Sequence, residues 1–305
     1  MSAHLPFRCG IVGIVGRPNV GKSTLVNRLV GQKIAIVADV PQTTRHRIQG
    51  IVNRPGGQIV LVDTPGIHRP RHAMNRWMVA QTGQTMSDCD LVVMMVEAVP
   101  GPGGDAAGFG PGDRFVLGML RPDGPKVLLA INKVDGVRKE ALLPRLAAAS
   151  QRFPFAGILM FSALTGENAH DLADRMLAHL PEGPALYPEE QFTDQVERQL
   201  VSEFIREKIL HNTRQEIPHE TCVIVETFQD GANGVTRIEA TILVEKDSQR
   251  GILIGKDGGR LKTVGTEARL ELEALLGRRL YIELWVKVAE GWRDDDRVLR
   301  RLGMG

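Results

Sequence analysis

Five segments in the first half of the chain are almost continuously hydrophobic: residues 9–15, 59–62, 91–96, 127–131 and 157–161. Unbroken runs of this kind are typical of strands that are buried on both faces of a sheet. Stretches with helical character lie between them, including residues 22–30 and 139–153. Strand and helix therefore alternate, which predicts an α/β domain with a sheet of mostly parallel strands.

The second half of the chain has a different pattern. Hydrophobic residues recur at helical spacing over 194–210 and alternate with polar residues over 221–228 and 236–244. A helix is expected over about 261–276, followed by a strand over 280–288 and a last helix. The order helix, strand, strand, helix, strand, helix predicts a separate α+β domain.

Prolines and glycines mark the connections. Three prolines between Leu180 and Pro188 restrict the backbone, so we expect domains at 1–180 and 194–305, joined by a linker at 181–193. Residues 100–112 are too rich in Gly and Pro for regular structure, and we expect a mobile surface loop there.

Composition excludes several classes of protein. No hydrophobic run approaches the ~20 residues that cross a bilayer, and the N-terminus lacks the hydrophobic core of a secretory signal, so a cytoplasmic protein is expected. The three cysteines are far apart and odd in number, which argues against a disulfide framework or a metal knuckle.

The segment Gly16-Arg-Pro-Asn-Val-Gly-Lys-Ser23 matches the phosphate-binding loop G-x-x-x-x-G-K-[ST] and stands between a predicted strand and a predicted helix. Gly16 and Gly21 let backbone N–H groups approach phosphates, and Lys22 reaches the β and γ phosphates. Ser23 can bind magnesium. A nucleoside triphosphate site is therefore predicted here.

Asp63-Thr-Pro-Gly66 follows the second hydrophobic run. Asp63 is thereby placed beside the phosphate loop, where it can hold magnesium through water, and the Gly66 N–H can sense the γ-phosphate. The tetrapeptide alone would be a weak signal, because it also occurs in ordinary turns. Together with the phosphate loop it is strong.

Two later motifs select guanine. In Asn132-Lys-Val-Asp135 the carboxylate of Asp135 can accept two hydrogen bonds from guanine N1 and N2, which adenine cannot offer. Ser162-Ala-Leu164 fits a loop whose backbone N–H contacts guanine O6. The predicted nucleotide-binding residues are Gly16, Asn19, Val20, Gly21, Lys22, Ser23, Thr24, Asp63, Asn132, Lys133, Asp135, Ser162, Ala163 and Leu164.

With these motifs in place, Pro41-Gln-Thr-Thr-Arg-His-Arg47 resembles the matching segment of the Era family, the bacterial ribosome-assembly GTPases of the translation-factor class. The resemblance covers nearly the whole chain and implies a GTPase that forms GDP and phosphate. It also implies that Thr44 is the switch threonine, which would bind magnesium together with Ser23 and Asp63. Neighbouring Thr43 is an alternative.

Ile67 stands where many small GTPases have the glutamine that orients the attacking water, so hydrolysis must be organised differently. Asn19 is similar to the residue that holds a potassium ion in cation-activated relatives, and such an ion could stabilise the developing charge. Alternatively, Asn19 only shapes the loop. The expected catalytic residues are Asn19, Lys22, Thr44 and Gly66.

In the second half, Gly255-Lys-Asp-Gly258 lies between two hydrophobic helical stretches, like the G-x-x-G clamp of a KH domain. Glycines there let the backbone approach a nucleotide strand closely. The order of elements resembles the type II KH arrangement of the Era family. The predicted RNA-binding residues are Ile254, Gly255, Lys256, Asp257, Gly258, Arg260 and Lys262.

Residues 190–305 contain 21 Asp and Glu against 18 Lys and Arg, so this half lacks an overall positive charge. Basic residues outnumber acidic ones around the clamp, and the binding face can still be positive. Asp294-Asp-Asp296 could either repel RNA or cap the last helix, and we expect it to cap the helix. Trp292 either belongs to the family's C-terminal signature or only packs.

The resemblance implies binding to ribosomal RNA, with the 3′ end of the small-subunit rRNA as target, and a role in assembly of the 30S subunit. The residues alone imply single-stranded RNA. A monomer is expected, cytoplasmic, with peripheral association at the inner face of the cell membrane. Two other classes are opposed by the motifs: a structural RNA-binding factor with a vestigial nucleotide site, and a membrane or transport GTPase whose second domain docks protein.

Overall fold

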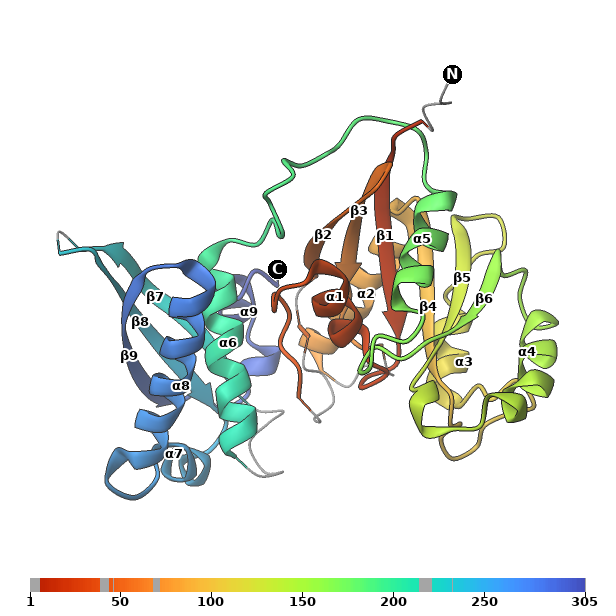
Figure 1. Cartoon of the computed structure of the whole chain (residues 1–305). Helices are drawn as coiled ribbons and strands as arrows, with labels where there is room; N and C mark the ends of the chain where they lie inside the picture. The colour runs from red at the N-terminus through yellow and green to blue at the C-terminus, as the bar shows by residue number, and fades with distance from the viewer. Residues whose placement is uncertain are drawn as a thin grey trace. The chain divides into compact units, whose positions relative to one another are not determined.

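A computed structural model describes residues 6–38, 44–45, 47–67, 72–213, 221–231 and 233–304. These residues form two compact units, shown in Figure 1. The first takes in the described residues within 1–35, 44–70 and 78–194. The second takes in those within 36–43, 71–77 and 195–305.

The first unit is built on one six-stranded sheet, in the order β2-β3-β1-β4-β5-β6 (Figure 1). Every neighbouring pair is parallel except β2 with β3, which confirms the predicted mostly parallel sheet. Each of the five hydrophobic runs forms a strand. The strands are β1 (Arg8–Gly16), β2 (Ile48–Arg54), β3 (Gly57–Asp63), β4 (Leu91–Glu97), β5 (Lys126–Asn132) and β6 (Gly157–Met160).

Helices cover both faces of this sheet. One hydrophobic cluster packs α1 and α5 against one face, and a second packs α3, α4 and part of α2 against the other. Burial on both sides explains why the strand sequences do not alternate. The bounds are α1 (Lys22–Val30), α2 (Ala73–Asp88), α3 (Pro111–Leu117), α4 (Leu143–Ser150) and α5 (Ala169–His179), with short 3-10 turns at Val134–Gly136 and Lys139–Leu142.

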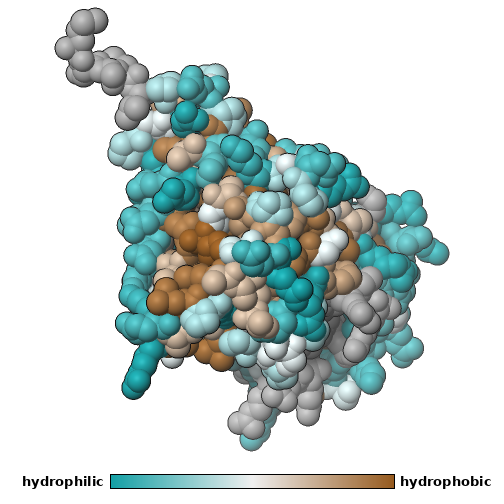
Figure 2. All heavy atoms as spheres, turned by 90° about the vertical axis from the view of Figure 1, so that its right-hand side faces the viewer, coloured by the Kyte–Doolittle hydropathy of each residue, from teal (hydrophilic) through white to brown (hydrophobic). Residues whose placement is uncertain are grey.

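The edge strand β6 is only half-buried along its length. Figure 2 views the molecule from the side on which β6 lies in Figure 1, and hydrophobic residues gather near the middle of that face. The strand at the opposite edge, β2, was not among the predicted strands. Its Gln49, Gly50 and Asn53 interrupt the hydrophobic pattern that reveals the other five.

The Gly- and Pro-rich segment is more firmly held than its sequence suggests. Its backbone is irregular up to Gly110, as expected, but Phe109 and Ala107 are buried, so the prediction of a surface loop is wrong for this part. The buried guanidinium of Arg145 donates hydrogen bonds to the carbonyl groups of Ala98, Ala107 and Gly108, at 2.5, 2.8 and 3.1 Å. The buried side chain of Arg145 thus binds three carbonyl groups in and next to the segment.

The second unit has a three-stranded sheet in the order β7-β8-β9, antiparallel between β7 and β8 and parallel between β8 and β9. Helices α6 and α8 pack on one face of it around a single hydrophobic core. This confirms the predicted α+β class. The bounds are α6 (Glu197–Asn212), β7 (Cys222–Asp230), β8 (Val235–Val244), α7 (Asp247–Ile254), α8 (Gly259–Leu276), β9 (Arg279–Val288) and α9 (Asp296–Arg301).

Two details of the C-terminal region resolve earlier alternatives. Asp295 is the N-cap of α9, since its side chain accepts hydrogen bonds from the backbone N–H groups of Arg297 and Val298, which confirms the capping role. Trp292 is almost completely buried, so packing explains it. Among the helices that the structure describes, none is long and apolar enough to cross a membrane.

Replacing Arg145 tests how the Gly- and Pro-rich segment is held. Arg145→Ala should lower stability by about 2–4 kcal/mol, because three buried carbonyl groups lose a charged donor. Thermal unfolding and the rate of limited proteolysis at residues 98–110 are the measurements. Arg152→Ala is the control, since it removes only the exposed ion pair with Asp105 and should cost less than about 1 kcal/mol. Equal losses in both variants would contradict the role of Arg145.

Candidate functional site

The carboxyl ends of β1, β3, β5 and β6 lie along one edge of the first sheet. Each of these strands leads directly into one of the predicted motifs. In open sheets of parallel strands, ligands bind at this edge. The fold therefore brings together four segments that are far apart in the sequence.

The side chain of Asn132 joins three of these segments. Its Nδ2 donates a hydrogen bond to the Val20 carbonyl in the phosphate loop, and its Oδ1 accepts one from the Ala163 N–H after β6, both at 2.8 Å. Gly21 has a φ of +99°, and a Cβ there would lie 2.3 Å from Asn132 Nδ2, so glycine is required. Asn132 thus positions the loops around the site.

Lys22 lies at the start of α1, where no side chain caps the helix. Helix N–H groups without side-chain caps form an anion-binding site. The Lys22 side chain is 6% exposed, and its Nζ donates to the carbonyl groups of Gly16 and Arg17, both at 3.2 Å. Burial lowers the pKa of Lys22 to about 8, against the opposing attraction of Asp63.

The three predicted magnesium ligands meet at one point. Ser23 Oγ donates to Asp63 Oδ2 at 2.7 Å, and Thr44 Oγ1 donates to the same oxygen at 3.2 Å. The two hydroxyl oxygens are 2.9 Å apart. Asp63 is completely buried, and its other oxygen, Oδ1, has no hydrogen-bond partner among the described residues. Burial raises the pKa of Asp63.

This donor set fits Mg²⁺, which prefers hard oxygen ligands. A buried carboxylate oxygen without a partner, flanked by two hydroxyl groups, provides such ligands. The described residues contain no group of three or more His, Cys, Asp or Glu side chains that could hold a metal. Phosphate oxygens and water would supply the ligands of an ion beyond Ser23, Thr44 and Asp63. Thr43, the alternative to Thr44, lies outside the described residues.

The segment after β3 packs against the phosphate loop. A Cβ on Gly66 would lie 2.8 Å from Pro18 Cα, and the Ile67 N–H donates to the Gly16 carbonyl at 3.3 Å. The Ile67 side chain is buried. It therefore offers nothing to orient a water molecule, in line with the missing glutamine. Asn19 is exposed in the same loop, with a φ of +61°.

Glu97, at the end of β4, was missed by the sequence reasoning. One of its carboxylate oxygens accepts from Arg17 Nη2 in the phosphate loop at 2.5 Å, and the other pairs with the Lys133 ammonium group. Glu97 therefore connects the phosphate loop to the guanine motif. The available signal is its place directly after the hydrophobic run at 91–96. Asp135, two residues beyond Lys133, is exposed at the same edge.

The loop after β6 is fixed from α1. Arg28 donates hydrogen bonds to the carbonyl groups of Ala163, at 2.6 Å, and Leu164. Ser162 is buried, and its hydroxyl accepts from the Thr165 N–H. These bonds fix the loop backbone at the rim. Thr24, also on α1, is half-buried there.

The second unit contains the predicted clamp. Gly255 has a φ of +74°, and a Cβ there would lie 2.8 Å from Arg260 Cβ. Asp257 and Gly258 also have positive φ, and Lys256 and Asp257 are exposed. The Arg260 guanidinium donates to the carbonyl of Ile252 near the end of α7. The half-buried Arg260 therefore links the helix after the clamp to the helix before it.

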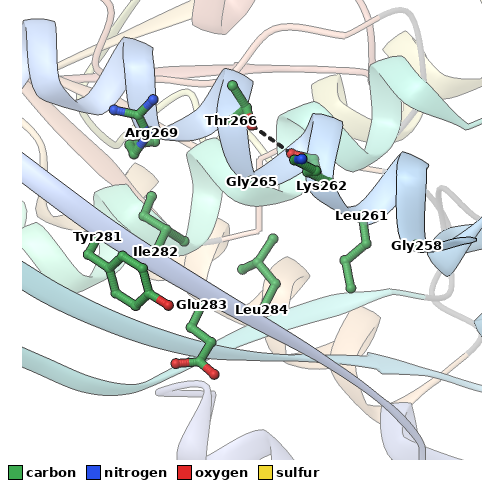
Figure 3. A pocket seen from close by; sticks show the side chains of 10 residues that line it. All are labelled: Gly258, Leu261, Lys262, Gly265, Thr266, Arg269, Tyr281, Ile282, Glu283 and Leu284. Carbon is green, nitrogen blue, oxygen red and sulfur yellow. Dashed lines mark hydrogen bonds between the residues drawn. The ribbon is translucent and has the colours of Figure 1, made fainter.

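A pocket of about 400 Å³ opens beside the clamp, between α8 and β9 (Figure 3). Of the predicted RNA-binding residues, Gly258 and Lys262 line it, whereas Ile254, Gly255, Lys256, Asp257 and Arg260 do not. The other lining residues are Leu261, Gly265, Thr266, Arg269, Tyr281, Ile282, Glu283 and Leu284. Those on α8 follow Gly258 at helical spacing, a signal that the sequence reasoning overlooked.

The pocket combines apolar, aromatic and charged groups. Ile282 and Leu284 point toward α8, whereas Tyr281 and Glu283 point away from it (Figure 3). Lys262 is exposed at the rim, and Arg269 pairs with Glu273 at 2.9 Å. An apolar floor with cations at the rim fits a nucleobase with its phosphates.

Comparisons with protein families agree with this division of the chain. A family described as 50S ribosome-binding GTPase matches residues 11–133, and the KH domain family matches residues 216–293. The chain is 48% identical to the GTPase Era of Heliobacterium modesticaldum over 97% of both chains. It is 46% identical to the GTPase Era of Geobacter metallireducens over 98% of both.

Two solved structures have the same fold over almost the whole chain, each with 36% identity and a TM-score of 0.91. One is an Aquifex aeolicus Era variant bound to GDP·AlF4⁻, and the match covers 98% of this chain and 100% of that one. The other is Era in complex with MgGDPNP and nucleotides 1506–1542 of 16S ribosomal RNA, with 98% and 99% covered. Both functional sites described above lie within the matched parts.

The lowered pKa of Lys22 predicts that GTP affinity falls as the pH rises above about 8. Below that pH the ammonium group is charged and pairs with the phosphates. Above it, binding must take up a proton, so the affinity should fall by about tenfold in all between pH 7 and pH 9. Titrations with GTP from pH 7 to 9 at constant ionic strength measure this. Lys22→Arg stays charged throughout and should give a flatter profile, and identical profiles would contradict the assignment.

Proposed function

The chain belongs to the Era family of GTPases, and from this premise we propose that it couples GTP hydrolysis to the assembly of the small ribosomal subunit. In this proposal it binds GTP with Mg²⁺ and binds small-subunit rRNA through its KH domain. The main support for nucleotide binding is that the side chains of Ser23, Thr44 and Asp63 lie together. One carboxylate oxygen of Asp63 is buried there without a hydrogen-bond partner.

In the first unit, catalysis would come from binding the phosphates of GTP and from stabilising the negative charge that develops on them. The phosphate-loop backbone and the start of α1 bind the phosphates, and the Lys22 ammonium pairs with the β and γ groups. When bound, magnesium neutralises charge that develops on the phosphate oxygens. Ser23, Thr44 and Asp63 would hold it, since their side-chain oxygens already lie together.

Base selection follows from Asp135. Its exposed carboxylate can accept hydrogen bonds from guanine N1 and N2. Asn132 supports this selection indirectly by fixing the loops on either side of the base. Glu97 supports it by pairing with Lys133. These contacts favour GTP over ATP at a site whose phosphate contacts alone do not distinguish the two.

The second unit would hold a single RNA strand. Its clamp presents glycine backbone to the strand, and the pocket between α8 and β9 would receive bases. The solved complex of Era with nucleotides 1506–1542 of 16S rRNA supports the same class of target for this chain. Because bacterial ribosomal subunits are assembled in the cytoplasm, we place the activity there.

We further propose that Asn19 helps to hold a monovalent cation beside the phosphates. Asn19→Gly keeps the positive φ without strain and removes only the side chain. In the parent, hydrolysis should be about tenfold or more faster in potassium than in sodium at equal ionic strength, and the variant should lose this difference. Phosphate release is the readout. Equal parental rates in both salts would rule out the cation and leave the GTPase assignment intact.

Gly258 provides the test of the RNA half. Gly258→Asp adds negative charge where the backbone would meet phosphates, so RNA affinity should fall about tenfold or more. Gly258→Asn is the matched control: Asp and Asn both tolerate positive φ, and a Cβ at this position meets open space. GTP hydrolysis without RNA should stay within about twofold of the parent. Parental RNA affinity in a folded Gly258→Asp protein would exclude the clamp as the RNA site.

A further inference from the structure

The outer face of the second unit's sheet carries two exposed aromatic side chains. Tyr281 is 53% exposed and Trp285 is 55% exposed. The β9 residues that alternate with them point to the other face of the sheet and contribute to the hydrophobic core. The chain contains only two tyrosines and three tryptophans. One of each on the same face of one strand is unusual, because single exposed apolar residues are normally scattered.

These two side chains continue the surface of the pocket. Tyr281 lines the pocket together with Gly258 of the clamp. Trp285 follows four residues later, on the same face, about 13 Å along the strand. Because β9 is an edge strand of the sheet, a chain leaving the pocket can pass around it onto the outer face. The aromatic pair therefore lies next to the proposed RNA site.

An arginine lies beside one of the two aromatic rings on this face. Arg237 is the cross-strand neighbour of Tyr281, and its guanidinium carbon lies 5.9 Å from the centre of the Tyr281 ring. The same guanidinium pairs with Glu239 at 2.7 Å and Glu283 at 3.2 Å, so its single positive charge compensates the two carboxylates only in part. Aromatic rings and arginine planes are the groups on which unpaired bases stack.

A protein partner fits this face less well. Glu283 lies between the two aromatic residues along the strand, so they do not form one continuous apolar patch. The cores of protein interfaces are depleted of charged residues, whereas a stacking surface tolerates charged groups between its rings. Two separate rings, one with Arg237 beside it, are suited to stack on separate bases of one RNA strand.

We propose that this outer face, made by Tyr281, Trp285 and Arg237 and here called the stacking face, binds nucleotides of single-stranded RNA adjacent to those in the pocket. The proposal rests on the proposed RNA-binding function and extends its footprint. A KH clamp holds about four nucleotides. The stacking face would lengthen the bound segment beyond these four by stacking, largely without regard to base identity.

The test uses the full-length protein and RNA oligonucleotides of two lengths. Four-nucleotide RNAs tiled across nucleotides 1506–1542 of 16S rRNA first locate the four that bind best. Eight-nucleotide RNAs then extend these four at the 5′ or the 3′ end. For one of the two extensions, the parent should bind the longer RNA at least about fivefold more tightly than the four-nucleotide RNA.

Trp285→Ala is the decisive variant because Trp285 does not line the pocket. It should lose this gain and keep the parental affinity for the four-nucleotide RNA, whereas Trp285→Phe should retain most of the gain. Leu270→Ala is the matched control, since it truncates a comparably exposed side chain on α8 and should change neither affinity. Circular dichroism on the same preparations verifies folding.

Two failures are distinguishable. If the parent binds neither RNA length, the RNA role of the second unit fails, and the stacking face fails with it. If the four-nucleotide RNA binds but Trp285→Ala keeps the full gain from extension, only the stacking face is overturned. Tryptophan fluorescence gives an independent readout: the longer RNA should quench the parent more strongly than Trp285→Phe, and equal quenching would also overturn the stacking face.

Discussion

A completely buried carboxylate with one unpaired oxygen is the constraint on which the nucleotide site depends. Removing a carboxylate from water is unfavourable unless hydrogen bonds or a cation compensate it. At Asp63 two hydroxyl groups share one oxygen, and Lys22 is the nearby positive charge. The other oxygen, Oδ1, would be available to a metal ion. Asp63 therefore favours a state in which cation and phosphates are bound together.

The surrounding side chains position the loops in two ways. Asn132 uses neutral hydrogen bonds inside the protein, where an amide can donate and accept at the same time. Glu97 uses ion pairs nearer the surface, to Arg17 and Lys133. The neutral contacts do not depend on ionic strength, whereas salt weakens exposed pairs. The phosphate loop is thus linked to the guanine motif in two ways: by a neutral hydrogen bond from Asn132 and by the ion pairs of Glu97.

Most of the first fold could be predicted because its strands are buried on both faces. β2 could not, since its Gln49, Gly50 and Asn53 hide an edge strand whose hydrogen bonds come from pairing with β3. The motifs allowed the nucleotide-binding residues to be predicted, because phosphate and metal chemistry demand fixed local sequences. Contacts in which one side chain reaches residues far away in the sequence leave no local sequence motif. Glu97 and Arg145 act across the fold, and their partners could be known only once the chain was folded.

The clamp of the second unit has a consequence for the thermodynamics of binding. Three of its four residues, Gly255, Asp257 and Gly258, have positive φ, and hydrogen bonds from Arg260 and the Gly255 N–H fix it between two helices. Contacts within the protein therefore hold its unusual backbone. RNA binding at this clamp would cost little conformational entropy on the protein side, and most of the ordering would occur in the RNA. Selectivity between targets would then depend on how readily each RNA segment is unpaired and extended, as well as on its base sequence.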